Sequence, residues 1–333
     1  MIDDVVFDEA GVRKGESSRL LVTEAEAGLR ADAFLAKAFP FLSRTRVRQK
    51  VQMGESLLNG RRFSTSARVR TGDEITVTWR GAPNTEAAPA LPILYEDEFL
   101  LAIDKPAGAA SHPMGRIQSG TVVQFARQRY AREIRESLES GDGRFYPSLV
   151  NRLDRFSSGI VLIAKTREAL AAAHALAARG GIAKSYVALV AGMLESEEGR
   201  IEIPIGRDES SGIRVKMKAA QGGLPSVTEY RIIRRLPSHT LVRAFPLTGR
   251  QHQVRVHFAA IGHPVWGDLL YKDDALFRRY LENGGKVDES LPPRHLLHAA
   301  RVSFAHPMTG AEIEISAPIP TDFEEILRYH RSK

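Results

Sequence analysis

The chain of 333 residues contains no cysteine. This absence excludes disulfide bonds, thiolate zinc sites and a cysteine nucleophile, and it favours a reducing compartment. No apolar run approaches the roughly 20 residues that a membrane-spanning helix needs. Residues 1–18 are acidic and then polar, whereas a signal peptide needs a basic start followed by an apolar stretch. We therefore expect a cytoplasmic protein with no membrane partner.

Motifs for nucleotides and metals are missing as well. The glycine-rich segments contain neither G-x-x-x-x-G-K-[ST] nor G-x-G-x-x-G, so no nucleotide cofactor is expected. His252 and His257 do not have the H-x-x-x-H spacing of a helical metal pair, and no carboxylate completes a ligand set. We predict neither a cofactor nor a metal site, which argues against a metal-dependent hydrolase.

Positive charge is what the chain has in excess. The net charge is +7 at neutral pH and the pI is near 9.6. Between Arg19 and Arg80 there are 12 lysines and arginines against 6 aspartates and glutamates, a local balance of +6. Nearly all of the excess therefore belongs to one module. Concentrated positive charge favours a polyanionic partner such as nucleic acid, although charge alone does not identify one.

The length suits two domains of ordinary size. An alanine- and proline-rich segment at 81–92 is typical of a linker. We therefore predict a flexible N-terminus at 1–18, a small α/β domain at 19–80, the linker, and a larger domain at 93–333. No protein partner is evident from the sequence.

Two short helices are predicted in the small domain. The apolar spacing over 30–39 suits one face of a helix that ends before Pro40, and Ser43 can cap a second helix over 43–54. The second helix stacks Arg44 over Arg48 and Arg46 over Lys50 at i,i+4 spacing, which disfavours the isolated helix. A phosphate backbone facing these side chains would relieve the repulsion.

The larger domain alternates strand-like and helical segments. Residues 158–166 form an apolar run typical of a buried strand, and the alanine-rich 167–181 predicts an amphipathic helix closed by two glycines. Strand patterns also occur over 93–105, 184–193, 239–247 and near 313, and a helix pattern occurs over 251–262. Strands outnumber helices at hairpin-like spacing, so we predict an α+β fold with a mixed, largely antiparallel sheet.

Asp154 is the most informative single residue. It lies between Arg152 and Arg155 in a loop that enters the 158–166 strand. A nearby arginine lowers the pKa of a carboxyl group, so Asp154 should be ionised and able to act as a nucleophile. A surface ion pair that merely closes the loop explains the same pattern, and the residues alone leave both explanations open.

The small domain resembles the RNA-binding domain named after ribosomal protein S-four. The resemblance lies in LRADAFLAK (29–37), LSRTRVRQKVQMGESLLNG (42–60) and VRTGDEITV (69–77). It implies that the basic helix faces structured RNA, with phosphate contacts from Arg44, Arg46, Arg48 and Lys50. A solvated basic helix without a partner is the alternative.

The larger domain resembles the RNA pseudouridine synthases of the RluA type. NRLDRFSSG (151–159) is similar to the family signature HRLDxxTSG, and further blocks follow the family order: DKPAGAASHP (104–113), KSYVALVAG (184–192), TGRQHQVRVHFAAIGHPVWGD (248–268) and LLHAARVSFAHPMTG (296–310). Asn151, Ser157 and Gln251 depart from the family's usual histidine and threonines. These departures leave the preferred RNA open and remove no catalytic group.

The resemblance implies a role for several residues. Asp154 would be the nucleophile, Tyr186 would stack on the uracil and assist proton transfer, and Arg255 would pair with the aspartate. Substrate-binding roles would fall to Arg152, Arg250 and Leu297, with Leu297 forming an apolar wall of the pocket. For Tyr186 the alternative is an ordinary tyrosine of a sheet.

The implied activity is the isomerisation of uridine to pseudouridine in structured RNA, without a cofactor. Large-subunit ribosomal RNA is the preferred substrate, because the two-module layout resembles the ribosomal members of the family, and transfer RNA is the second choice. The alternative function is a non-catalytic RNA-binding or ribosome-assembly factor that keeps the fold without turnover.

Overall fold

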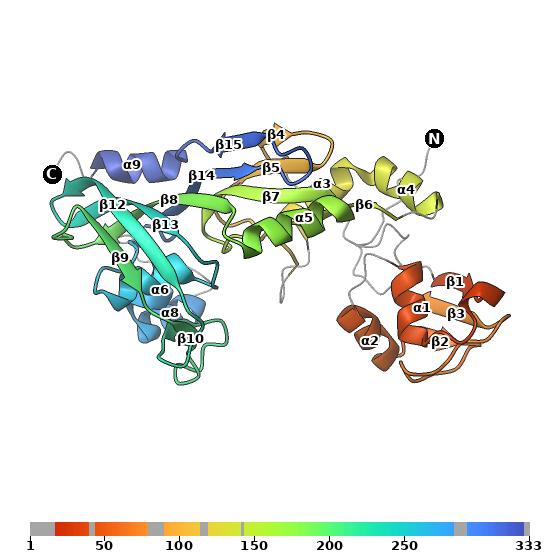
Figure 1. Ribbon diagram of the computed structural model, residues 1–333. Coiled ribbons are helices and arrows are strands. Elements are labelled where there is room, and N and C mark those ends of the chain that lie inside the picture. Colours follow the sequence, from red (N-terminus) through yellow and green to blue (C-terminus); the bar gives the residue numbers. More distant parts are fainter. Residues whose placement is uncertain are drawn as a thin grey trace. The chain divides into compact units, whose positions relative to one another are not determined.

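The computed structural model describes residues 17–39, 44–78, 90–113, 119–140, 143–282 and 292–329 (Figure 1). The chain divides into two compact units, one of residues 1–89 with 112–147 and one of residues 90–111 with 148–333. The predicted domain bounds and the identity of the small domain stay a prediction.

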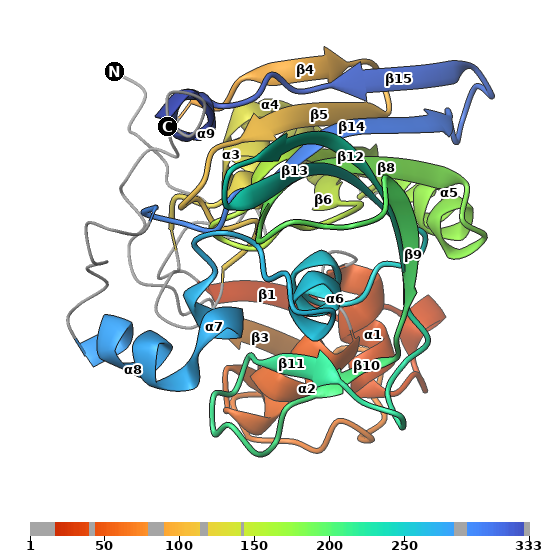
Figure 2. The same ribbon diagram turned by 90° about the vertical axis from the view of Figure 1, so that its left-hand side faces the viewer.

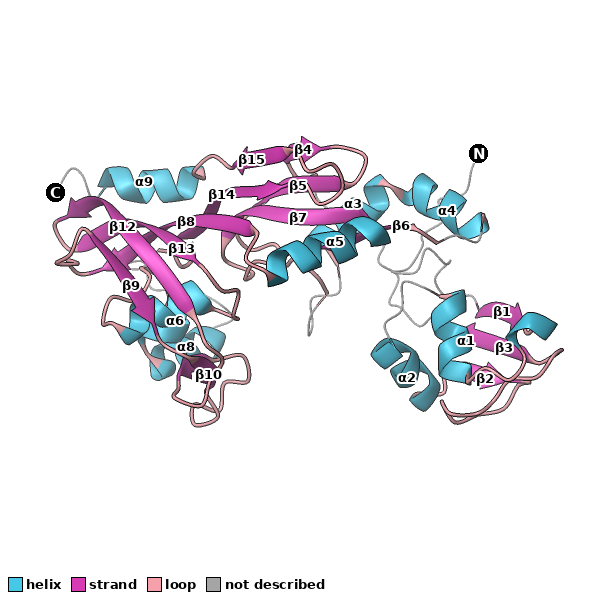
Figure 3. Cartoon of the chain, in the orientation of Figure 1, coloured by secondary structure: helices cyan, strands magenta, loops and turns pink. Residues whose placement is uncertain are grey.

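The described residues 17–39 and 44–78 form a small sheet packed against two helices. The sheet is antiparallel in the order β1 (Ser17–Leu21), β3 (Glu74–Thr78) and β2 (Ser56–Leu58), and a 3-10 turn, η1 (Glu24–Glu26), follows β1. Helices α1 (Ala31–Ala38) and α2 (Arg44–Gln52) confirm the two predicted helices (Figure 3). Their apolar faces meet β3 in one core, to which Phe34, Leu35, Val47, Val51, Ile75 and Val77 belong. The predicted cap, Ser43, lies outside the described residues.

Two helices and a strand lie between the 104–113 and 151–159 blocks of the predicted larger domain. Helix α3 (Val122–Arg129) begins after Thr121, whose hydroxyl oxygen accepts a hydrogen bond from the Gln124 amide. Helix α4 (Ala131–Glu139) and strand β6 (Phe145–Leu149) follow. The guanidinium of Arg127 lies 4.3 Å from the centre of the Tyr146 ring.

A large mixed sheet dominates the second unit. Its strands pair in the order β4-β5-β7-β14-β8-β13-β12-β9, and β15 pairs with β14. The β7–β14 pairing is parallel and the other pairings along this order are antiparallel, which confirms the predicted α+β class. The strands are β4 (Ile93–Glu96), β5 (Leu100–Lys105), β7 (Ser158–Thr166), β8 (Ile182–Ala191), β9 (Glu198–Glu202), β12 (Val227–Leu236), β13 (His239–Pro246), β14 (Leu297–Ala305) and β15 (Glu312–Ser316). A separate hairpin pairs β10 (Ile205–Arg207) with β11 (Met217–Ala219).

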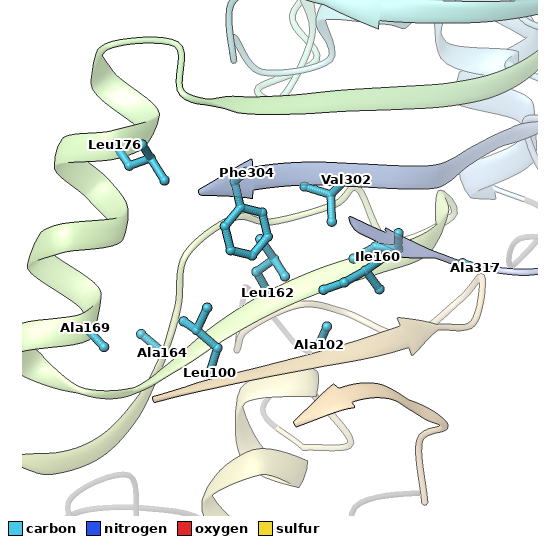
Figure 4. Packing of buried hydrophobic residues seen from close by; sticks show 11 residues of the cluster. Leu100, Ala102, Ile160, Leu162, Ala164, Ala169, Leu176, Val302, Phe304 and Ala317 are labelled. Carbon is cyan, nitrogen blue, oxygen red and sulfur yellow. The ribbon is translucent and has the colours of Figure 1, made fainter. Parts of the chain in front are cut away.

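Helix α5 (Arg167–Ala178) covers one end of this sheet. Figure 4 shows its side chains Ala169 and Leu176 beside the apolar side chains of β5, β7 and β14. The continuous apolar run of β7 is explained by this packing, because eight of its nine residues are buried. A strand buried on both faces needs no polar alternation.

Two further helices lie on opposite faces of the sheet. On β8, Ala188 and Val190 pack in the core of α6 (Gln253–Ala260), whereas Val187 and Leu189 pack in the core of α9 (Thr321–Tyr329). Successive side chains of a strand point to opposite faces, so α6 and α9 are on opposite sides. Figure 2 shows α6 within the curve of β8, β12 and β13. Helices α7 (Leu269–Lys272) and α8 (Asp274–Glu282) follow α6. In the described ranges no helix has both the length and the apolar character to cross a membrane.

Candidate active site

Asp154 lies in the loop before β7 and faces α6. Its Oδ2 accepts a hydrogen bond of 2.9 Å from Arg255 Nη1. The same guanidinium donates from Nε and Nη2 to the two carboxylate oxygens of Asp268, at 2.6 and 2.8 Å. Arg255 is buried on α6, and Asp268 is buried immediately before α7. One cation therefore holds two carboxylates and fixes the direction of the Asp154 side chain.

The surroundings keep Asp154 ionised. Burial raises the pKa of its carboxyl group, but the charges of His252, Arg255 and His295 outweigh burial and lower the pKa to about 2. At neutral pH the effective cation is Arg255, because burial lowers the pKa of His252 to about 4 and that of His295 to about 3. Asp154 therefore has the charge state that a nucleophile requires.

The Asp104–Pro113 block of the sequence supports the Asp154 loop. Lys105 is fully buried, and its ammonium donates to the carbonyl oxygens of Pro106, Ala109 and Arg155 at 2.8–3.0 Å. Ser111 Oγ donates to the carbonyl oxygen of Leu153 and accepts from its amide. These bonds hold the loop at Leu153 and at Arg155, the residues on either side of Asp154, against β5 and the segment that follows it.

The residues that depart from the family pattern keep structural contacts. Asn151 accepts a hydrogen bond from the Leu162 amide at 2.7 Å and donates to the Ile160 carbonyl oxygen at 3.3 Å. Ser157 Oγ lies 2.8 Å from His295 Nε2. Gln251 is exposed and its side-chain amide donates to the Val215 carbonyl oxygen. In this protein Asn151 and Ser157 therefore anchor the two ends of the Asp154 loop.

Gly159 is needed where β7 starts beside β14. Its φ is +108°, and a Cβ built there would lie 2.2 Å from the carbonyl oxygen of Ala299. Only a residue without a side chain fits such an approach. The parallel register, in which Ser158 faces His298, depends on this contact.

A cavity of about 370 Å³ opens beside Asp154. The predicted catalytic and substrate-binding residues all line it: Asp154, Tyr186, Arg255, Arg152, Arg250 and Leu297. Tyr186 stands on β8, and burial together with the charge of Asp154 raises the pKa of its hydroxyl, so it stays protonated. Leu297 is buried, whereas Arg152 and Arg250 are exposed at the opening. The volume is within the range of small-molecule sites.

The sequence analysis missed several residues of the site. His252 and Gln253 line the cavity, and Asp268, Tyr271 and Lys105 support it. His252 and Asp268 lie within the 248–268 block, so the block indicated the region without indicating their roles. Among the described residues, no group of three or more histidines and carboxylates could hold a metal ion.

The predicted RNA-contacting residues lie on α2. Arg48 is exposed, and its Nε lies 3.8 Å from Asp32 Oδ2. Lys50 is largely buried and donates to Glu55 Oε2 at 3.2 Å. The side chains of Arg44 and Arg46 lie outside the described part of the chain. Arg48 is therefore better placed than Lys50 for a phosphate contact.

The fold is similar to that of known enzymes. Two solved structures resemble the chain, the human RNA pseudouridylate synthase domain-containing proteins 1 and 4. Their TM-scores are 0.54 and 0.55, at 23% and 22% identity; they cover 74% and 72% of this chain, which in turn covers 97% and 93% of theirs. At this identity the likeness shows a shared fold, that of pseudouridylate synthases.

The sequence comparisons go further. The family model described as RNA pseudouridylate synthase matches residues 99–260. An uncharacterised RNA pseudouridine synthase of Bacillus subtilis is 31% identical over 92% of this chain and 96% of its own length. Ribosomal large subunit pseudouridine synthase D of Xanthomonas campestris is 33% identical over 92% and 90%, and synthase C of Escherichia coli is 33% identical over 93% and 96%. The chain belongs to the RNA pseudouridine synthase family and is an isomerase that acts on RNA.

Proposed function

We propose that this enzyme converts uridines of large-subunit ribosomal RNA to pseudouridine with Asp154 as the nucleophile. The observation that carries the proposal is the ion pair of Asp154 with buried Arg255 at the wall of the cavity. Two of the similar proteins are named as ribosomal large subunit enzymes, which supports this choice of RNA. Transfer RNA is the alternative substrate.

The target uridine must leave its stack before its glycosidic bond can be reached, which costs a few kcal/mol that protein contacts offset. Arg152 and Arg250, exposed at the opening of the cavity, are placed to contact the phosphates beside the flipped nucleotide. Tyr186 offers an aromatic face for the uracil, and Leu297 forms an apolar wall. The arginines thus bind the backbone, and the deeper residues bind the base.

The chemistry requires only the residues of the site. Asp154 either attacks the anomeric carbon of the ribose or takes part in a route through a glycal. In both routes the bond between the anomeric carbon and N1 of uracil breaks. The uracil rotates and carbon five bonds to the anomeric carbon. The hydrogen of carbon five then leaves as a proton, for which the Tyr186 hydroxyl is one relay, and N1 of uracil, which kept the electron pair of the broken bond, takes up a proton. No electrons are gained or lost, and Asp154 is regenerated.

The proposed role of residues 19–80 is to hold the RNA during this reaction. The support is the concentration of positive charge there and the exposure of Arg48 on α2. Clustered cations release condensed counterions when they contact a phosphate backbone, and this gain favours binding. Arg44 and Arg46 share the proposed role, whereas the ion pair of Lys50 with Glu55 makes it a weaker contributor.

Mapping of pseudouridines in cells that lack the gene tests the proposed function. Loss of one or more pseudouridines from large-subunit ribosomal RNA, restored by the wild-type gene and not by Asp154→Asn, is the expected result. Unchanged ribosomal RNA with a missing pseudouridine in transfer RNA would refute the choice of substrate. Restoration by Asp154→Asn would refute the assignment of the nucleophile.

A further inference from the structure

His252 has an unusual position beside the nucleophile. It stands at the start of α6 in the left-handed region, with a φ of +57°. Its Nε2 lies 3.7 Å from Asp154 Oδ1, on the carboxylate oxygen that Arg255 does not contact. Its Nδ1 lies 2.7 Å from the hydroxyl oxygen of Tyr271. The imidazole is therefore inserted between a tyrosine hydroxyl and the catalytic carboxylate.

The hydrogen-bond partners determine which ring nitrogen of His252 carries the proton. The hydroxyl oxygen of Tyr271 already accepts a hydrogen bond from the Met217 amide at 3.2 Å. Burial raises the pKa of Tyr271, so the hydroxyl keeps its proton and needs an acceptor. Among the described residues, His252 Nδ1 is the acceptor in contact with this hydroxyl, which leaves the proton of the neutral ring on Nε2, facing Asp154.

The backbone of His252 is held in place by its neighbour. The side-chain oxygen of Gln253 accepts hydrogen bonds from Thr248 Oγ1 at 2.7 Å and from the Arg250 amide at 3.0 Å. The left-handed conformation costs a residue with a side chain about 1 kcal/mol. Strained residues of this kind persist where the surroundings fix them, and they are concentrated at functional sites.

We propose that Tyr271 and His252 form a donor relay that positions Asp154 for the reaction: the Tyr271 hydroxyl holds the His252 ring so that its Nε2–H points at Asp154 Oδ1. The proposal rests on the proposed function, because it assigns a task to the surroundings of the Asp154 nucleophile. Arg255 holds Oδ2 and His252 holds Oδ1, so the plane of the carboxylate is fixed from two sides. The separation of 3.7 Å is longer than a hydrogen bond and is expected to shorten when substrate fills the cavity.

The relay has a use in either route. If Asp154 forms an ester with the ribose, the ester carbon–oxygen bond later breaks and its electron pair returns to the carboxylate. Donors aimed at the carboxylate stabilise that developing charge. If Asp154 acts through a glycal, the same donors hold it at the sugar. Tyr271 and His252 are positioning residues, since their proposed effect passes through Asp154.

The first test is Tyr271→Phe, with the steady-state rate measured as a function of pH. Without the hydroxyl, the neutral ring can place its proton on Nδ1 and turn a lone pair toward Asp154. We expect kcat at pH 8 to fall by about tenfold with KM unchanged, which corresponds to the loss of one hydrogen bond of about 1.4 kcal/mol in the transition state. An unchanged kcat would overturn the relay, and so would a rise in KM as large as the fall in kcat.

The pH dependence gives the relay a signature that a purely structural role lacks. A protonated ring carries hydrogen on both nitrogens, so acid restores the Nε2–H donor in Tyr271→Phe. Because burial lowers the pKa of His252 to about 4, the ratio of variant to wild-type kcat should rise as the pH falls from 6 to 4. The charged groups that face His252 are Arg152, Asp154, Arg255 and Asp268. Arg255 holds the pKa of both carboxyl groups low, so Asp154 and Asp268 stay ionised over this range. A constant ratio would contradict the proposal.

Two substitutions of His252 separate the relay from backbone strain. His252→Gln places an amide N–H near the position of Nε2, whereas the shorter His252→Asn does not. Asparagine tolerates the left-handed region better than glutamine. The relay predicts a higher kcat for His252→Gln, and a role limited to backbone conformation predicts a higher kcat for His252→Asn.

Nitrogen-15 spectra of histidine-labelled protein report the tautomer directly, with the His252 signal identified by its loss in His252→Gln. The expected wild-type signal is the Nε2–H form, which shifts toward the Nδ1–H form in Tyr271→Phe. An Nδ1–H form in the wild type would refute the relay. Inactive Asp154→Asn with a fully active Tyr271→Phe would refute the relay alone, whereas active Asp154→Asn would refute the proposed function.

Discussion

Removal of Arg255 should change both the charge state and the placement of Asp154. In Arg255→Ala, Asp154 loses the donor at 2.9 Å and Asp268 loses both of its donors. Breaking a buried ion pair on one side destabilises a protein by about 3–5 kcal/mol. The variant should therefore melt at a lower temperature, and its activity is to be measured below that melting temperature.

The effect on the charge of Asp154 can be estimated from its pKa. The pKa is about 2 in the wild type, and because burial raises it, loss of the Arg255 guanidinium should move it toward the ordinary value of 3.8. The change corresponds to about 60-fold tighter proton binding, or ~2.5 kcal/mol. Because the carboxyl group must lose its proton before it attacks, kcat/KM of Arg255→Ala should rise between about pH 3 and pH 5, through the raised pKa of Asp154. Over the same pH range the wild-type kcat/KM should not change through titration of Asp154, because the carboxyl group of Asp154 is already ionised.

Release of tritium from RNA with uridine labelled at carbon five measures the rate. Asp268→Asn is the matched control, because it disturbs the same network but leaves Arg255 beside Asp154. The pKa of Asp154 should stay low in this control and kcat/KM should keep the wild-type pH dependence. Identical pH dependence in Arg255→Ala and Asp268→Asn, or wild-type rates in Arg255→Ala, would refute the reasoning.

Three further predictions concern the cavity, the sheet and the basic helix. Tyr186→Phe should bind RNA as the wild type does and lose most of its turnover, because the ring remains and the hydroxyl is gone; wild-type kcat would contradict this. Gly159→Ala should lower the free energy of unfolding by at least ~3 kcal/mol, whereas Gly180→Ala, with φ +75° and open space for a Cβ, should lower it by ~1 kcal/mol; equal melting temperatures would contradict this. Arg48→Ala should reduce the slope of the logarithmic affinity against salt by about 0.9, and an unchanged slope would exclude a phosphate contact.

The sequence predicted the elements whose pattern is local. The apolar run of β7 and the alanine-rich pattern of α5 identified a buried strand and the helix that covers it. Helix α1 was predicted from its apolar spacing, α2 from the Ser43 cap, and α6 from the helix pattern over 251–262. The parallel pairing of β7 with β14 was beyond such reasoning, because it joins residues about 140 positions apart through a close approach at Gly159.

The site was only partly predictable for a similar reason. The charge pattern around Asp154 identified a candidate nucleophile, but the flanking arginines Arg152 and Arg155 are not its ion-pair partners within the described contacts. The partner is Arg255, which was expected from the family resemblance and not from spacing. Asp268 supports the site through its ion pair with Arg255, and Lys105 through its hydrogen bond to the Arg155 carbonyl oxygen. Both contacts join residues distant in the sequence, so the roles of Asp268 and Lys105 were not predicted.

Asp154→Asn tests the central claim most directly. The substitution keeps the size and shape of the side chain and removes its negative charge, and the described residues place no other carboxylate among those that line the cavity. The account predicts a folded protein that binds RNA about as tightly as the wild type and releases no detectable tritium from uridine labelled at carbon five. If the ion pair with buried Arg255 had only a structural role, its loss would lower the free energy of unfolding by up to about 3–5 kcal/mol and leave the activity of the folded protein largely intact. Tritium release by the folded variant at near the wild-type rate would contradict Asp154 as the nucleophile.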